Sequence, residues 1–192
     1  AGTYELCKYY EKKLEVVRKK FEEVSSRVKV KKSLNESDLA LYYSDWSYMA
    51  CWLLSGIDEV KKRSDLADRL HLSMKRINDV CDFLVKVGLI IEGEELSIGN
   101  SRTHIGREHP LVSKHHTNWR LKSLEYTDKV KLTDLAFTAP LSISKKDFSK
   151  VKEELLTTIE KISDTVSDSD PDTITFLNID FIEVYRLQCL CL

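Results

Sequence analysis

The stretch that decides the fold is SDLADRLHLSMKRINDVCDFLVKVGLIIEGEELSI, residues 64–98. Ser64 is a good N-cap for a short helix over 65–70. Ser73 is a good N-cap for a longer helix, which Gly88 ends. Two short β-prone runs separated by an acidic turn complete the stretch. A short helix, a tight turn, a longer helix and a hairpin are typical of a winged helix-turn-helix, which we predict for the middle of the chain.

Outside this stretch the chain divides into further parts. Ser37 is a good N-cap for a helix that ends near Ser55 and supplies the first helix of the same domain. A polar connector follows the hairpin, and Pro110 suits the first turn of another helix. We predict an α+β, mostly α protein with four parts: an N-terminal long helix and basic connector (1–35), a winged helix-turn-helix core (36–100), a linker helix (101–130) and a C-terminal strand-helix-strand (βαβ) unit (131–192).

A repeated apolar pattern predicts one long helix over residues 4–30. Its apolar positions alternate in spacing between three and four residues: Cys7, Tyr10, Leu14, Val17, Phe21, Val24 and Val28. A 3.5-residue period over about three heptads is the lower limit for a coiled coil. Two interpretations stay open, an amphipathic helix docked on its own domain and a seam between two copies of the chain.

The C-terminal unit is predicted from a change of period. Residues 135–143 alternate between apolar and polar as in a strand, although Pro140 favours an edge position or a bulge. An amphipathic helix over 145–162 and a β-prone run over 174–184 follow. Because two strands do not make a stable sheet, they must pair with the wing or with another subunit. Together with the N-terminal seam, this predicts a homodimer.

The charge is distributed unevenly along the chain, although the net charge is only −1. Residues 1–32 contain ten Lys/Arg against five Glu, and residues 100–122 contain five against one. Residues 123–172 instead contain seven Lys against eleven acidic residues. We therefore expect one side of the protein to face an anion and another to be solvated.

Motifs for several other functions are missing from the sequence. No apolar run reaches the ~18 residues of a membrane span, and no signal peptide opens the chain. The five cysteines lack a zinc-type spacing, which fits a reducing compartment. There is no Gly-rich phosphate loop, nucleophilic serine motif or zinc-protease helix. We predict a cytoplasmic protein that is not an enzyme, with no cofactor, no metal and no membrane partner.

The candidate site is the first turn of the predicted longer helix, whose outward side chains suit the major groove of DNA. Arg can form two hydrogen bonds to guanine and Asn two to adenine. The residues predicted to face the bases are Ser73, Lys75, Arg76 and Asn78. The residues predicted to contact backbone phosphates are Lys61, Lys62 and Arg63. Because Glu92, Glu94 and Glu95 would repel phosphate, we expect the wing to stay outside the groove.

Three runs outside the winged helix are similar to those of a known family. They are YYSDW at 42–46, SISKKDF at 142–148 and LNIDF at 177–181. With the winged helix and the segment around His115 and His116, the resemblance covers about residues 35–185. The chain resembles a bacterial paralogous family of predicted transcriptional regulators, of the Fibrobacter and Bdellovibrio type, that carries a domain of unknown function.

This resemblance implies a DNA-binding regulator and no catalytic residues. Members of the family usually carry a further small helix-turn-helix domain upstream, which we expect this chain to lack. The predicted function is a sequence-specific transcriptional regulator that binds double-stranded DNA with a winged helix, with an unidentified effector or protein partner as a further possibility. The alternative is a dimerisation or protein-interaction scaffold whose DNA reader is the missing upstream domain.

Overall fold

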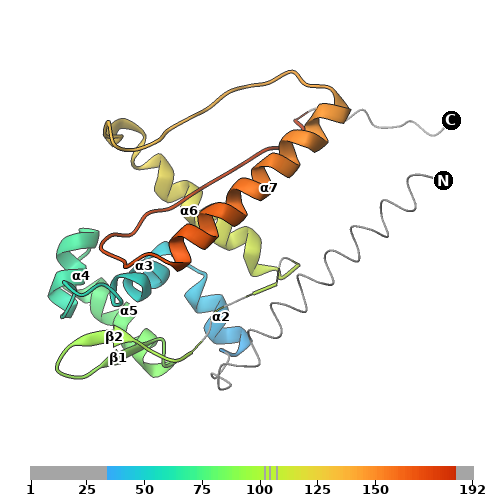
Figure 1. Cartoon of the computed structure of the whole chain (residues 1–192). Helices are drawn as coiled ribbons and strands as arrows, with labels where there is room; N and C mark the ends of the chain where they lie inside the picture. The colour runs from blue at the N-terminus through green and yellow to red at the C-terminus, as the bar shows by residue number, and fades with distance from the viewer. Residues whose placement is uncertain (1–33, 102, 104, 107, 185–192) are drawn as a thin grey trace.

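The computed structural model describes residues 34–101, 103, 105, 106 and 108–184. The predicted helix over 4–30, with its apolar seam, lies outside these residues. The described chain is mostly helical and has one two-stranded antiparallel sheet (Figure 1). The predicted α+β, mostly α class is therefore confirmed. None of the described helices is both long and apolar enough to cross a lipid bilayer.

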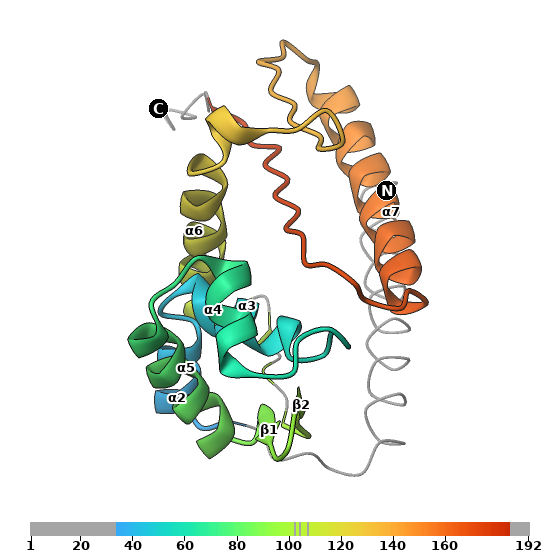
Figure 2. The same cartoon turned by 90° about the vertical axis from the view of Figure 1, so that its left-hand side faces the viewer.

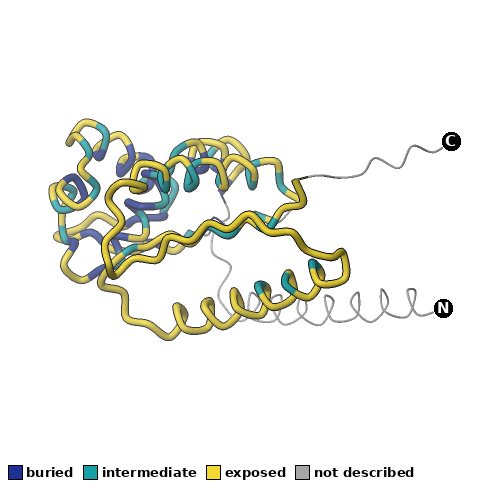
Figure 3. The backbone as a smooth tube through the Cα atoms, turned by 90° about the horizontal axis from the view of Figure 1, so that it is seen from above, coloured by how far each residue is buried: buried dark blue, intermediate teal, exposed yellow. Residues whose placement is uncertain are grey.

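The core lies in the first half of the described chain, where the buried residues gather (Figure 3). Its helices are α2 (Glu36–Tyr42), α3 (Trp46–Leu54), α4 (Arg63–Leu70) and α5 (Met74–Lys86). Helices α3, α4 and α5 pack on one another. The largest fully buried side chains include Tyr42, Ile57, Leu66, Ile77 and Leu84. Cys51 and Cys81 are free thiols buried in this core, where they pack as small apolar side chains.

The single helix expected between Ser37 and Ser55 is instead two helices, α2 and α3. The Asp45 carboxylate accepts a hydrogen bond from the Ser47 N–H at 2.9 Å, so Asp45 begins α3 as its N-cap. Asn35, and not Ser37, begins α2, because its side chain accepts from the Asp38 N–H at 2.9 Å. Asp competes for backbone N–H groups in this way, which interrupts a helix that the apolar pattern alone would continue.

The turn between α4 and α5 follows the expected course. His71 takes a left-handed conformation (φ 53°) and ends α4. Ser73 begins α5, since its hydroxyl accepts a hydrogen bond from the Arg76 N–H, which confirms the predicted cap. Lys62, and not Ser64, is the N-cap of α4. There the Asp65 carboxylate accepts the two N–H groups that precede the helix, which stabilises its start.

The predicted hairpin is present and is attached at both ends. Strand β1 (Ile90–Glu92) pairs antiparallel with β2 (Leu96–Ile98), with Ile90 opposite Ile98. Gly88 (φ 75°) turns the chain from α5 into β1. The Leu96 N–H donates to the Lys61 carbonyl at 2.8 Å, so β2 is hydrogen-bonded to the connection between α3 and α4. The hairpin is thereby held against the bundle.

The second half of the described chain is more open. It contains α6 (Leu111–Leu124), the short helix η1 (Thr127–Lys129) and α7 (Lys145–Ser167). Helix α6 agrees with the predicted linker helix, and its Leu121 and Leu124 side chains are exposed. Helix α7, predicted over 145–162, begins at Ser144, whose hydroxyl accepts a hydrogen bond from the Asp147 N–H.

The strands of the predicted strand-helix-strand unit are not formed. Residues 135–143, before α7 in the chain, and 174–184, after it, are drawn out, as Figures 1 and 2 show, but neither belongs to a sheet. The prediction of a C-terminal βαβ unit was therefore wrong in its strands. A strand needs a neighbour, and the described chain offers none to either segment, while Pro140 lacks the N–H that a ladder requires.

The segment after α7 returns along α6. Arg120 on α6 forms an ion pair with Asp180, and the Asn178 side-chain amide donates to the Trp119 carbonyl at 3.3 Å. On the other side, Phe181 stacks on Phe148 at the start of α7, with ring centroids 4.4 Å apart. Side-chain contacts therefore join α6, this segment and the first turn of α7.

Candidate nucleic-acid interface

The start of α5 presents several exposed side chains. Ser73, Lys75 and Asn78 are exposed, as the sequence predicted for this turn. Met74 is also exposed, at 45%. The Ser73 hydroxyl already accepts the Arg76 N–H as a helix cap. The outward surface of this turn is therefore formed mainly by an apolar side chain, one cation and one amide.

Arg76 lies apart from the rest of this surface, because it is held against α3. Its Nη2 donates to the Asp45 carboxylate at 2.9 Å and to the Ser47 hydroxyl at 3.0 Å. Its guanidinium also lies over the Tyr48 ring, 5.2 Å from the centroid. These contacts join the first turns of α3 and α5. In this arrangement Arg76 orients α5, and the contact with bases predicted for it would require these bonds to break.

The same contacts affect the acid strength of Asp45. Burial works to raise its pKa, but hydrogen bonds from Ser47 and Arg76 outweigh burial and hold the pKa below its ordinary value of 3.8. A carboxyl whose pKa is lower in the folded state stabilises the fold above its unfolded pKa. This contribution is lost as the pH falls through the folded value.

We predict that Asp45→Asn flattens the acid limb of the stability curve. Asn still caps a helix, so the substitution removes mainly the charge, and the loss at neutral pH should be no more than about 1 kcal/mol because the pair is partly exposed. The difference from the unmodified protein should shrink as the pH falls below 3.8. Urea unfolding at a series of pH values measures this difference in the free energy of unfolding. If the two curves of unfolding free energy against pH stay parallel down to acid pH, the ion pair between Asp45 and Arg76 does not contribute to stability.

Arg63 is the most constrained of the predicted phosphate-binding residues. Its guanidinium donates to both Glu92 oxygens, at 2.7 and 2.5 Å, and to Asp82 at 2.7 Å, and its side chain is only 19% exposed. The bond to Glu92 raises the pKa of Arg63 above its ordinary value. Arg63 also donates to the Asn78 side-chain oxygen at 3.3 Å. This residue joins the start of α4, the exposed face of α5 and β1, an arrangement we name the Arg63 clamp.

Two carboxylates of the acidic hairpin form ion pairs with cations near the start of α4. Glu92 belongs to the Arg63 clamp, and Glu95 forms an ion pair with Lys61 at 2.9 Å. Each of these carboxylates therefore neutralises the charge of a cation at or just before the start of α4. Glu94 is exposed and forms no ion pair with a described residue. The sequence carried no local signal for these pairs, because their members lie far apart in the chain.

Lys86, in the last turn of α5, is exposed and has no ion-pair partner among the described residues, and the same holds for three further exposed cations around α4 and the start of α5. Lys62 lies at the start of α4, Arg69 in its last turn and Lys75 in the first turn of α5. The Asn78 side chain accepts from Arg63 through its oxygen, which leaves its NH₂ group for another acceptor. Apart from Lys86, the groups able to bind an anion thus lie beside the turn between α4 and α5 and at the start of α4.

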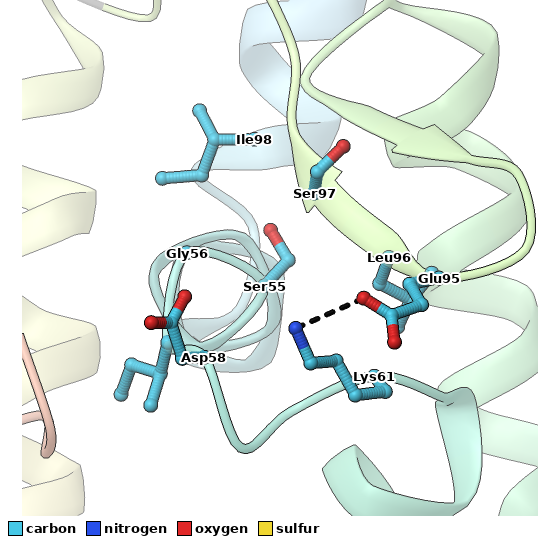
Figure 4. A pocket seen from close by; sticks show the side chains of 9 residues that line it. Ser55, Gly56, Asp58, Lys61, Glu95, Leu96, Ser97 and Ile98 are labelled. Carbon is cyan, nitrogen blue, oxygen red and sulfur yellow. Dashed lines mark ion pairs between the residues drawn. The ribbon is translucent and has the colours of Figure 1, made fainter.

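A shallow hollow of about 480 Å³ lies beside the hairpin, between the end of α3 and β2 (Figure 4). Its lining includes Asp58, Ile98 and the ion pair of Lys61 with Glu95. The Ser55 hydroxyl, which also lines it, donates to the Trp52 carbonyl at 2.7 Å. Among the described residues, neither lining serine is hydrogen-bonded to Asp58 or Glu95, so no carboxylate is placed to activate a serine hydroxyl in this hollow.

The described residues define a mostly helical protein with one small hairpin and a mixed-charge surface around α5. The chain belongs to the DUF4423 family, a domain of unknown function, whose model matches residues 12–184. This confirms the part of the resemblance that concerned a family with a domain of unknown function. Comparison with curated proteins and with solved structures gives no match.

Proposed function

We propose that the protein binds double-stranded DNA through a winged helix formed by α3, α4, α5 and the hairpin. The observation that supports this most is the form of α5. It is capped by Ser73, packed on α3 and α4, followed by a hairpin, and exposed at its first turn. A helix placed in this way can enter a major groove by its N-terminal end. We propose that it acts as a cytoplasmic, sequence-specific transcriptional regulator.

The exposed side chains around α4 and α5 divide into those that suit phosphates and one that suits a base edge. Lys62, Arg69 and Lys75 are exposed cations that suit backbone phosphates. The Asn78 amide suits a base edge, because Asn recognises adenine in the major groove. In this proposal the hairpin stays outside the groove, and Arg63 and Arg76 hold α5 in position. Two copies would then read a two-fold symmetric site, which is the usual way for such domains to gain specificity.

The test is a double variant, Lys62→Ala with Lys75→Ala, in the full chain. We expect DNA affinity at low salt to fall about tenfold, and the slope of log affinity against log salt to fall by about 1.8, since each phosphate contact contributes about 0.9. Fluorescence anisotropy with a labelled duplex of mixed sequence measures both quantities.

The matched control is Lys146→Ala with Lys152→Ala, which removes the same charge from exposed positions on α7. It should leave the salt slope unchanged. An equal loss in both double variants would indicate attraction by net charge alone. Failure of the unmodified protein to bind any duplex would overturn the proposal.

A second function, a protein-interaction scaffold, is favoured by a specific observation. Three of the five cations predicted to bind DNA are paired with carboxylates: Lys61, Arg63 and Arg76. A surface neutralised in this way suits a protein partner better than a polyanion. Absence of DNA binding in the experiment above would favour this function.

A further inference from the structure

Helix α7 has an apolar face that no described residue covers along most of its length. The face includes Leu155, Ile159, Ile162 and Val166, spaced by four, three and four residues. Ile159, Ile162 and Val166 are 37%, 38% and 67% exposed. Phe181 covers the start of the helix at Phe148, and Figure 2 shows the rest of α7 standing apart from the bundle. A spacing of this kind is the pattern of a helix that packs along another helix.

We propose that residues 7–28 of the same chain cover this face, as the second strand of a parallel two-helix coiled coil. Their apolar residues repeat with the same alternation of three and four. The length also fits, because 22 residues of helix extend about 33 Å and the 23 residues of α7 about 35 Å. Of the two interpretations that the N-terminal pattern left open, this is the helix docked on its own domain.

The charges of the two segments determine their relative direction. Residues 18–32 contain seven Lys/Arg against two Glu, whereas residues 153–172 contain one Lys against seven acidic residues. A parallel arrangement places the basic half of one segment beside the acidic half of the other. An antiparallel arrangement would instead place the basic half beside residues 145–152, which hold four Lys and one Asp. Opposite charges flanking an apolar seam select partner and orientation.

The attachment points of the two segments agree with the same direction. Leu34 is buried in the core, only six residues after Val28. Ile174 packs on the same core, seven residues after Ser167 ends α7. The C-terminal ends of both segments are therefore tied to one core by short connections. A six-residue connection spans at most about 20 Å, so it keeps residues 7–28 at high effective concentration beside their own α7.

The extent of the family model is consistent with this arrangement. It matches residues 12–184, so most of the N-terminal segment and the whole of α7 belong to one family domain. A domain whose long apolar helix faces had no cover would expose more contiguous apolar surface than folded proteins usually do. The proposal does not depend on DNA binding.

The first test is zero-length cross-linking of Lys to Asp or Glu with a carbodiimide. An equal mixture of ¹⁴N- and ¹⁵N-labelled full chains distinguishes links within a chain from links between chains. We expect links within one chain from Lys29, Lys31 or Lys32 to the acidic stretch 160–172. Links to Asp147 instead would overturn the parallel direction. Mixed-isotope links would assign the face to a second copy and overturn the proposal.

The second test compares Ile159→Asp with Thr157→Asp by hydrogen exchange. Both add one negative charge to α7, but Thr157 lies on the opposite side of the helix from Ile159. We expect amide protection of residues 7–28 to fall at least tenfold in Ile159→Asp and to stay unchanged in Thr157→Asp. Protection in residues 74–86 reports that the core remains folded. Equal protection in both variants, or none in the unmodified chain, would overturn the proposal.

Discussion

Gly99→Ala is expected to lower the free energy of unfolding by about 3 kcal/mol, at the upper end of the usual cost of overpacking. A Cβ at this position would lie 2.8 Å from the Gly88 carbonyl carbon and 2.9 Å from that of Leu89, both of them backbone atoms. Neither can withdraw easily. The Gly99 N–H donates to the Leu89 carbonyl at 2.7 Å, and the Ser101 N–H to the Gly88 carbonyl at 3.1 Å. The end of β2 is thus held against the turn that follows α5.

The control for this variant is another glycine in the same hairpin. Gly93 has no atom within 4 Å of the position that a Cβ would take. Gly93→Ala should therefore change stability by less than about 0.5 kcal/mol. Urea unfolding of both variants measures the difference in midpoint. Equal midpoints would mean that the backbone at Gly88 moves aside, contrary to the close approach described here.

The part of the fold that could be predicted is the part with local signals. The Ser73 cap, the stop at Gly88 and the acidic turn each depend on residues within a few positions, and α5 with its hairpin formed as expected. The break between α2 and α3 was missed for the opposite reason. The continuous apolar face favoured one helix, and the capping bond of Asp45 prevailed over it.

The C-terminal half shows that the apolar pattern of a segment does not decide whether it becomes a strand. Alternating apolar residues over 135–143 and a β-prone run over 174–184 predicted two strands, but both segments are drawn out without joining a sheet (Figure 1). Whether such a segment becomes a strand depends on a partner, which no local pattern specifies. The segment after α7 instead uses side chains, with Asp180 bound to Arg120 and Phe181 stacked on Phe148.

The sequence predicted which residues at the start of α5 are exposed, but not which cations are paired with carboxylates. Lys75 and Asn78 are exposed on the first turn of α5, as the helix period indicated. The neutralisation of Arg63 by Glu92 and of Arg76 by Asp45 joins residues 29 and 31 positions apart, which depends on the folded arrangement. A Lys or Arg chosen from sequence as a DNA contact therefore has to be checked in the structure for a carboxylate that already neutralises it.

The Arg63 clamp leads to the second large prediction. We expect Arg63→Ala to lower the free energy of unfolding by about 2 kcal/mol, since hydrogen bonds to charged groups contribute about 1.5–3 kcal/mol and Asp82 is largely exposed. The variant also leaves Glu92 and Asp82 without their shared cation. Lys62→Ala, one residue earlier, should cost less than about 0.5 kcal/mol because its side chain is exposed. Urea unfolding of the two variants measures both values.

DNA binding by the same two variants separates the two roles of a cation. If Arg63 holds the hairpin on α5, Arg63→Ala lowers stability and leaves the salt slope of binding unchanged, measured where the variant is fully folded. If Arg63 instead releases Glu92 and contacts phosphate, the slope falls by about 0.9, as we expect for Lys62→Ala. The Arg63–Glu92 coupling from a double-mutant cycle with Glu92→Gln provides a check that needs no DNA. A coupling near zero would contradict the clamp, because its bonds to both Glu92 oxygens would then contribute nothing to stability.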